Sequence, residues 1–160
     1  MAVYLKYAAI NGEVKTKGFE KWIECNSFQW GVGRGIGSPK GGSPSKRESS
    51  EASVSEITLT KEMDTTDPKL LHEALIGKMD NKVEIAITNT MPGGGAQDFA
   101  HYTLENTAIS GYSLSSGGDR PSVSISLNFS KVEFKYTSYD AAGTGTPETV
   151  GYNLADTTKS

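Results

Sequence analysis

The sequence predicts a mainly β fold, an antiparallel β-barrel or sandwich of about seven to eight strands with one short α-helix and a long extended loop. Three features indicate this fold class. Several short segments alternate apolar and polar residues with a period of two, which is the pattern of half-buried strands. One segment alone carries apolar residues at helical spacing. The 160 residues include 18 glycines, so much of the chain is expected in turns and loops.

The N-terminal part of the chain is expected to form two strands. Residues 3–7 place apolar side chains on one face, and the Asn-Gly pair at 11–12 then predicts a tight turn. A second strand is expected at residues 19–30. Its apolar residues change parity between Cys25 and Phe28, which indicates a β-bulge because one extra residue re-aims every side chain that follows.

A third strand is expected at residues 54–61, and the helix follows it. Asp67 is expected as the N-cap, Pro68 as the first helical residue, and Gly77 as the residue that ends the helix. An apolar stripe at helical spacing must pack on a sheet face or on the end of a barrel. The stripe consists of Leu70, Leu71, Ala74 and Leu75.

The C-terminal half alternates in the same way. Residues 83–87, 99–104 and 109–114 predict three further strands. The clearest alternation runs over residues 122–136, with a change of parity that indicates a β-bulge near Ser130.

Two segments lack this periodicity. Residues 140–160 are expected to form a loose tail, with a short element at 152–154. Residues 31–50 are rich in glycine and serine, and two interpretations stay open for them: a solvated insert, or an assembly arm that orders against a partner. The basic residues of this extended loop are Arg34, Lys40, Lys46 and Arg47.

Composition limits the classes of function. The length suits a single domain over residues 1–160. A net charge of −3 gives no support to nucleic-acid binding, and no apolar run is long enough to predict membrane insertion. The first residues lack the pattern of a secretory signal peptide. The single cysteine, Cys25, excludes an internal disulfide framework.

No catalytic constellation is found in the sequence, so the prediction is that the chain is not an enzyme and needs no cofactor or metal. His72 and His101 each lack a second ligand at metal-binding spacing. The glycine run at 31–37 fails both phosphate-loop patterns, and residues 111–115 fail the nucleophile-elbow pattern.

An acidic cluster precedes the helix. Glu62, Asp64 and Asp67 lie where negative charge favours the positive end of a helix dipole. The same three carboxylates are candidates for meeting the basic loop of a neighbouring copy of the chain.

Several segments, taken in order, resemble the Hcp (haemolysin-coregulated protein) family of type VI secretion systems. The most specific likeness is to the closing strand of that family, at residues 127–136. The resemblance rests on Phe28–Gly31, Ile57–Leu71, Asn106–Tyr112, Ser115–Pro121, Leu127–Tyr136 and Gly151–Asn153.

The resemblance implies a β-barrel subunit of hexameric rings that stack into a tube. Such a tube carries effector proteins in its lumen and works with sheath and spike components. It assembles in the bacterial cytoplasm and is then secreted without a signal peptide. The resemblance places Gln29 toward the lumen and the loop at 31–50 against neighbouring subunits and rings.

Two alternatives remain at this point. One is a monomeric β-sandwich module that binds a ligand such as a carbohydrate through exposed aromatic residues. The aromatic candidates are Tyr4, Tyr7, Trp22, Tyr102 and Tyr112. The other is a tail-tube protein of a phage-like particle. A ring predicts a large particle without any ligand, whereas a binding module predicts a monomer.

Overall fold

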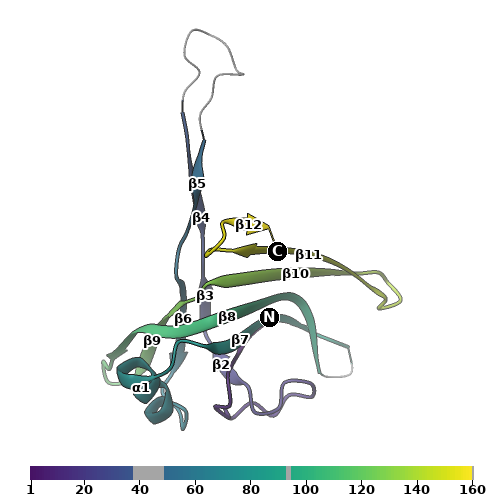
Figure 1. The fold of residues 1–160 in the computed structure, drawn as a ribbon. Helices are drawn as coiled ribbons and strands as arrows, with labels where there is room; N and C mark the ends of the chain where they lie inside the picture. Colours follow the sequence, from purple (N-terminus) through teal and green to yellow (C-terminus); the bar gives the residue numbers. More distant parts are fainter. Residues whose placement is uncertain (38–48, 93–94, 160) are drawn as a thin grey trace.

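The computed structural model describes residues 1–37, 49–92 and 95–159 and confirms a mainly β, antiparallel fold with one short helix (Figure 1). These residues form twelve strands, more than the seven to eight expected. Ten of the strands make one continuous sheet that folds into two layers. The other two, β4 (Val32–Ile36) and β5 (Ser49–Val54), form a separate hairpin.

The large layer contains seven strands in the order β12-β11-β10-β8-β7-β1-β2. Their bounds are β1 (Ala2–Tyr7), β2 (Ile23–Cys25), β7 (Asn81–Thr90), β8 (Ala96–Ser115), β10 (Lys131–Tyr139), β11 (Gly145–Asn153) and β12 (Thr158–Lys159). The small layer places β6 between β3 and β9, and β9 also pairs with the C-terminal half of β8. Its own strands are β3 (Ser27–Gln29), β6 (Ile57–Glu62) and β9 (Ser122–Asn128).

Strand β8 belongs to both layers. Its first half pairs with β7 and β10, and its second half, from Ala108, pairs with β9. Between the halves, Asn106 has a φ of 51°, a left-handed conformation that Asn tolerates better than most residues. The strands expected at 99–104 and 109–114 are therefore one bent strand.

Both predicted bulges are wrong, and each is a change of layer. At Asn26 the chain leaves β2, which pairs with β1, and enters β3, which pairs with β6. At Phe129 and Ser130 it leaves β9 in the small layer and enters β10 in the large one. A change of layer re-aims the following side chains as a bulge does, so the parity signal is the same.

The hydrophobic core lies between the two layers. Most of the alternating apolar residues predicted for β1, β6, β7 and β9 are buried there, as expected, whereas Val3 and Ile87 are only partly buried. Its fully buried members include Leu5, Ile23, Ile57, Leu59, Val83, Ile85, Leu104, Ile125 and Leu127. A small second cluster of Tyr4, Phe19 and Ala86 lies apart from this core, with Trp22 packed against it.

The Asn-Gly pair at 11–12 does not form a turn. Gly12 donates its backbone N–H to the Lys21 carbonyl, and a Cβ on Gly12 would lie 2.2 Å from the Trp22 carbonyl oxygen. The glycine is therefore explained by this close approach of two backbone segments.

Helix α1 (Asp67–Ile76) ends at Gly77 as expected, but its N-cap is Thr66. Asp67 is instead the first helical residue, and its carboxylate accepts hydrogen bonds from Lys61, Tyr112 and the Asp64 N–H. The predicted stripe is only partly buried. Leu70 is fully buried and Ala74 packs against the core, whereas Leu71 and Leu75 are exposed.

Two segments that were predicted to be irregular contain regular strands in the structure. Parts of the loop at 31–50 form the β4–β5 hairpin, and the tail expected to be loose contains β11, paired with β10 along its whole length. β4 is exposed on both faces, as is β11 up to Val150. Burial therefore imposes no alternation on them, which is why the period-two signal is absent.

Candidate assembly surfaces

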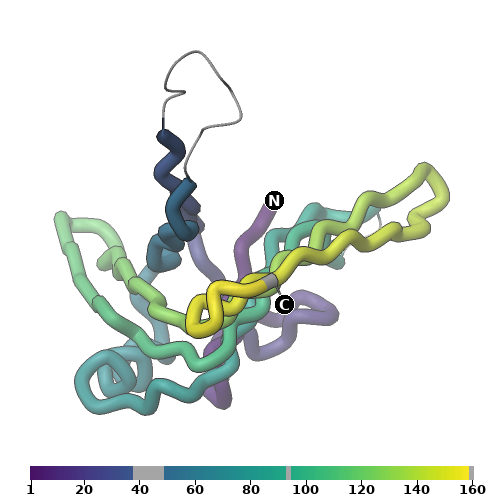
Figure 2. Tube along the Cα trace, turned by 45° about the horizontal axis from the view of Figure 1, so that its top comes forward, coloured from purple at the N-terminus to yellow at the C-terminus, as the bar shows by residue number. Residues whose placement is uncertain are grey.

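The β4–β5 hairpin, called the arm below, projects from the body in both views (Figures 1 and 2). Its base is fixed where the Trp30 indole N–H donates to the Ser55 carbonyl at 3.1 Å, and the Gly31 N–H donates to the Ser55 hydroxyl at 3.0 Å. Arg34 is exposed on the arm, opposite Ala52 in the strand pairing. The other predicted basic residues, Lys40, Lys46 and Arg47, lie outside the described residues.

Gln29 lies at the end of β3, just before the arm begins. It is exposed and pairs with Thr58 of β6. Its side chain is therefore free to meet another molecule on that face of the small layer.

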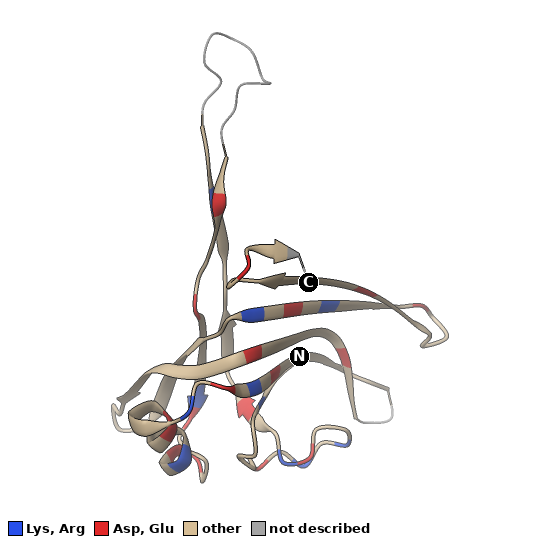
Figure 3. Ribbon diagram, viewed as in Figure 1, with Lys and Arg blue, Asp and Glu red and all other residues tan. Residues whose placement is uncertain are grey.

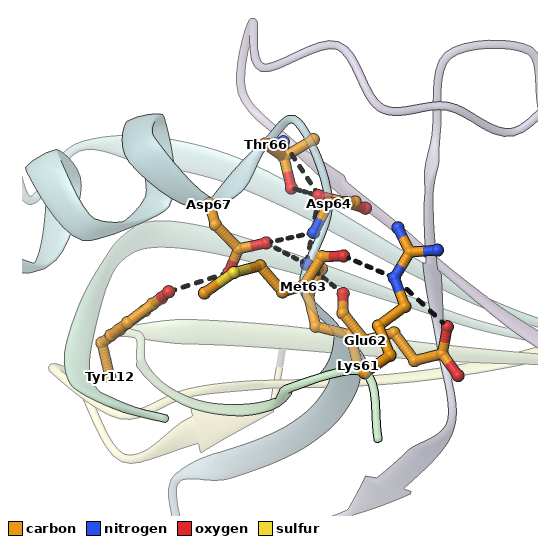
Figure 4. Close-up of polar contacts among 8 residues, drawn as sticks. Lys61, Glu62, Met63, Asp64, Thr66, Asp67 and Tyr112 are labelled. Atoms are coloured by element: carbon orange, nitrogen blue, oxygen red, sulfur yellow. Dashed lines mark hydrogen bonds and ion pairs between the residues drawn. The ribbon is translucent and has the colours of Figure 1, made fainter. Parts of the chain in front are cut away.

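A buried ionic cluster joins β6 to α1 (Figure 4). The Lys61 ammonium is fully buried and donates to the Asp67 carboxylate at 2.7 Å, and its Nζ lies 3.1 Å from the Asp64 carboxylate. It also donates to the Glu62 carbonyl at 2.8 Å, so three acceptors surround its three protons. The Tyr112 hydroxyl donates to the second oxygen of Asp67 at 2.9 Å.

The environment of this cluster keeps Asp67 ionised. Burial acts to raise the Asp67 pKa, but hydrogen bonds from the Asp64 N–H, Lys61 and Tyr112 outweigh it and lower the pKa. Burial and the adjacent Asp67 carboxylate raise the pKa of Tyr112 to about 12. The cluster is thus a fixed structural contact between β6 and α1 that is made through the Asp67 carboxylate.

The three predicted acidic residues consequently differ in what they present to a neighbour. Asp67 and Asp64 are occupied by Lys61, and their side chains are 5% and 12% exposed. The Glu62 side chain is 61% exposed, with the Arg120 guanidinium 3.7 Å from its carboxylate. Among these three, Glu62 offers the accessible carboxylate.

The two histidines lie on different elements. His72 is exposed on α1, and His101 on β8 lies between two carboxylates. Its Nδ1 is 2.6 Å from Asp98, and its Nε2 is 3.3 Å from Glu84. The hydrogen bond to Asp98 raises the pKa of His101, against the opposing effect of burial.

Other site chemistry was sought across the part of the chain that the structure describes. No group of three or more His, Cys, Asp or Glu residues there is arranged to hold a metal ion. Within the same ranges, no helix combines the length and hydropathy needed to cross a membrane. Burial raises the pKa of Cys25 to about 12, so its thiol stays protonated at neutral pH.

The aromatic residues of the binding-module alternative do not form one exposed platform. Tyr4 and Tyr7 are buried, and the Tyr112 hydroxyl is engaged with Asp67. Tyr102 stacks on Phe134, with ring centroids 4.8 Å apart.

Sequence reasoning missed an apolar surface, called the wing face below. It is made by Phe134, Tyr136 and Val150 of the large layer together with Trp30 at the base of the arm. A groove of about 130 Å³ lies between Trp30, Phe134 and Val150. Tyr136 is 48% exposed and Val150 53% exposed. The alternation of apolar residues predicts strand β10. The alternation does not show that the small layer leaves this part of β10 uncovered.

A second exposed apolar surface, the helix patch, lies on and just after α1. It consists of Leu71, Leu75, Ile76 and Met79. The sequence places Leu71 and Leu75 in the helical stripe, but only the structure shows that they face away from the core.

These surfaces define a class of protein. The arm, the wing face and the helix patch are extended surfaces, which is the organisation of a structural protein that works through contacts with other chains.

Comparison with known proteins agrees with this class. A family model described as "Type VI secretion system effector, Hcp" matches residues 4–136. The chain belongs to the Hcp family, and it is a structural, non-enzymatic tube protein of the type VI secretion system. No curated protein sequence gives a match.

Solved structures share the fold. One described as a type six secretion system protein is 26% identical with a TM-score of 0.86, and the match covers 99% of each chain. Hcp1 from Salmonella typhimurium is 18% identical with a TM-score of 0.76, over 99% of this chain and 98% of that one. A type VI secretion system effector from Yersinia pestis is 18% identical with a TM-score of 0.71, over 94% and 98%.

Proposed function

We propose that this chain forms hexameric rings that stack into a tube and carry effector proteins in the lumen. The arm is the observation that supports this most directly. All five residues of β4 are exposed, and a two-stranded hairpin is marginally stable in water by itself. An arm that projects from its own body gains stability by packing on another subunit.

Arg34 on the arm and the basic residues that follow it in the sequence are proposed to meet acidic residues of a neighbouring subunit or ring. Arg34 is exposed, and Lys40, Lys46 and Arg47 remain candidates by sequence. Figure 3 shows charged residues of both signs over the body. Among the three acids proposed as counterparts, the accessible carboxylate is that of Glu62, so it is the preferred partner for this contact.

The remaining partners follow from the family. Gln29, exposed beside the base of the arm, is proposed to face the lumen and its effectors. Sheath and spike components are proposed to meet the assembled tube. The protein is proposed to act in the bacterial cytoplasm during assembly and to leave without a signal peptide, with no part in nucleic-acid binding or membrane insertion.

The native mass of the purified protein tests the proposal. Sedimentation is expected to give a mass near six chains of 17.1 kDa, with rings in negative-stain images. A single-chain mass over a wide range of protein concentration would overturn the ring.

A further inference from the structure

The wing face continues the core side of β10 beyond the small layer. Along β10, Val132 is buried, Phe134 is half-buried and Tyr136 is exposed. These three residues alternate, so they point to the same side of the strand. The side of β10 that faces the core therefore continues beyond the small layer, where no described strand of that layer covers it.

Strand β11 extends this surface. Val150 pairs with Phe134 and Glu148 pairs with Tyr136, so each pair shares a side of the sheet. Figure 2 shows the β10–β11 hairpin reaching away from the body. The wing face is thus an apolar strip with one carboxylate toward its outer end.

The helix patch lies on the side of α1 that faces away from the core, whereas the other side of α1 packs against the core. Leu70 fixes α1 to the core, while Leu75, on the same helix, is 72% exposed. Ile76 and Met79 extend the patch past the C-terminal end of the helix, and the exposed Lys78 lies between them in the sequence. The patch is therefore apolar with an ammonium at its edge.

Helix α1, which carries most of the helix patch, lies at one end of the body, and the β10–β11 hairpin, whose strands carry most of the wing face, extends toward the other end (Figure 1). A surface that binds its own copy gives a two-fold dimer. A surface that binds a different surface of the next copy gives a head-to-tail chain, which closes when the rotation per subunit fits a ring.

We infer that the wing face of one copy receives the helix patch of the next copy, with Glu148 placed to meet Lys78 across the contact. The occupant is a second copy because each surface matches the other in chemistry, apolar on both sides and opposite in charge at the edge. This inference rests on the ring proposed above and names the surfaces that close it.

Cysteine cross-linking tests the pairing. A double variant, Val150→Cys with Leu75→Cys, is treated with a short bismaleimide, and the wild-type chain, whose Cys25 is buried, serves as the blank. The expected product is a covalent ladder up to six chains. Val150→Cys alone and Leu75→Cys alone are each expected to give no cross-link, and an equal mixture of these two variants is expected to give dimers only.

Other outcomes separate the inference from the ring itself. A native mass of six chains with no cross-link in the double variant would overturn the pairing and leave the ring intact. Dimers formed by Val150→Cys alone or by Leu75→Cys alone would also overturn it, because they would show a surface that meets its own copy. A wild-type monomer would overturn the ring and the pairing together.

Substitution gives an independent readout. Val150→Asp and Leu75→Asp are each expected to raise the ring-to-monomer midpoint concentration about tenfold or more, since apolar anchors dominate interface energies. Leu114→Asp is the matched control, because Leu114 is about as exposed as Val150 but lies outside both surfaces. Glu148→Lys is expected to weaken the ring, and adding Lys78→Glu to restore it. Unchanged midpoints in the first two variants, or no restoration in the third, would contradict the inference.

Discussion

The Lys61 ammonium lies 2.7 Å from the Asp67 carboxylate, and both side chains are almost completely buried where β6 turns into α1. Tyr112 of β8 completes the contact through Asp67. One ion pair therefore connects the small layer, the helix and the strand that belongs to both layers. In such a buried pair, loss of one partner leaves a charge without compensation.

Replacing Lys61 with Met is expected to destabilise the subunit strongly. The substitution leaves Asp67 and Asp64 beside each other without their cation, and the cost expected for a broken buried pair is about 3–5 kcal/mol. Urea unfolding measures it. Lys131→Met is the matched control, because Lys131 forms a partly exposed pair with Glu105 at 3.8 Å. This substitution should change the free energy of unfolding by less than about 1 kcal/mol. Equal effects of the two variants would contradict the role of the buried cluster.

Replacing Tyr112 with Phe removes the hydroxyl that donates to Asp67. A hydrogen bond to a charged group contributes about 1.5–3 kcal/mol, so the free energy of unfolding should fall by an amount in that range. Tyr102→Phe is the control, because the Tyr102 ring contributes by stacking on Phe134, which Phe preserves. A loss no larger than that of the control would show that Asp67 finds another donor.

A pH titration tests His101. The folded-state pKa of His101 is raised above its ordinary value of 6.5, because the Asp98 and Glu84 carboxylates favour the imidazolium. The stabilisation is therefore fully present below pH 6.5 and is lost as pH rises through the folded-state pKa. We expect the free energy of unfolding to decrease as the pH increases from 6.5 through the folded-state pKa of His101.

The matched variants for this titration are His101→Asn and His72→Asn. The first should remove the decrease in stability at rising pH, and the second should keep it, since His72 is exposed on α1. A decrease that survives in His101→Asn would assign the pH dependence to another group.

The sequence predicts the strands of the core well because burial on one face imposes a period of two. The same period of two also predicts that Lys61, a member of the ionic cluster, is buried. Lys61 shares parity with Ile57 and Leu59, so it lies on the buried side of β6 and requires a buried partner. Asp64 and Asp67 follow closely in the sequence, and this placement predicts the pairing once the parity of Lys61 is considered.

Other features could not be read from local pattern. The bend of β8 at Asn106 depends on which strands pair with each half. The wing face and the helix patch depend on where the small layer ends, which is a property of the tertiary structure. β11 lacks alternation because most of it is exposed on both faces.

Salt is expected to weaken ring stacking, because Arg34 on the arm and the basic residues that follow it in the sequence are proposed to act through charge. Exposed pairs are screened over about 10 Å at 0.1 M salt and about 3 Å at 1 M. Sedimentation at the two salt concentrations measures the change, and Arg34→Ser should reduce it. Lys135→Ser, at an exposed position on β10, is the control. Assemblies that sediment alike at both concentrations would contradict the charge pairing.

Two leucines of one helix are expected to separate folding from assembly. Leu70→Ala empties a fully buried position and should cost about 2–5 kcal/mol of unfolding free energy, measured in urea at a dilution where the chain is monomeric. Leu75→Ala, at a largely exposed position, should change that free energy by no more than about 0.5 kcal/mol, yet it should weaken the ring. If Leu75→Ala destabilised the monomer as much as Leu70→Ala, the helix patch would be part of the subunit core. If Leu75→Ala left both quantities unchanged, the patch would have no part in assembly. Only stable folding combined with weaker association fits a helix that uses one flank to hold its own subunit and the other to hold the next.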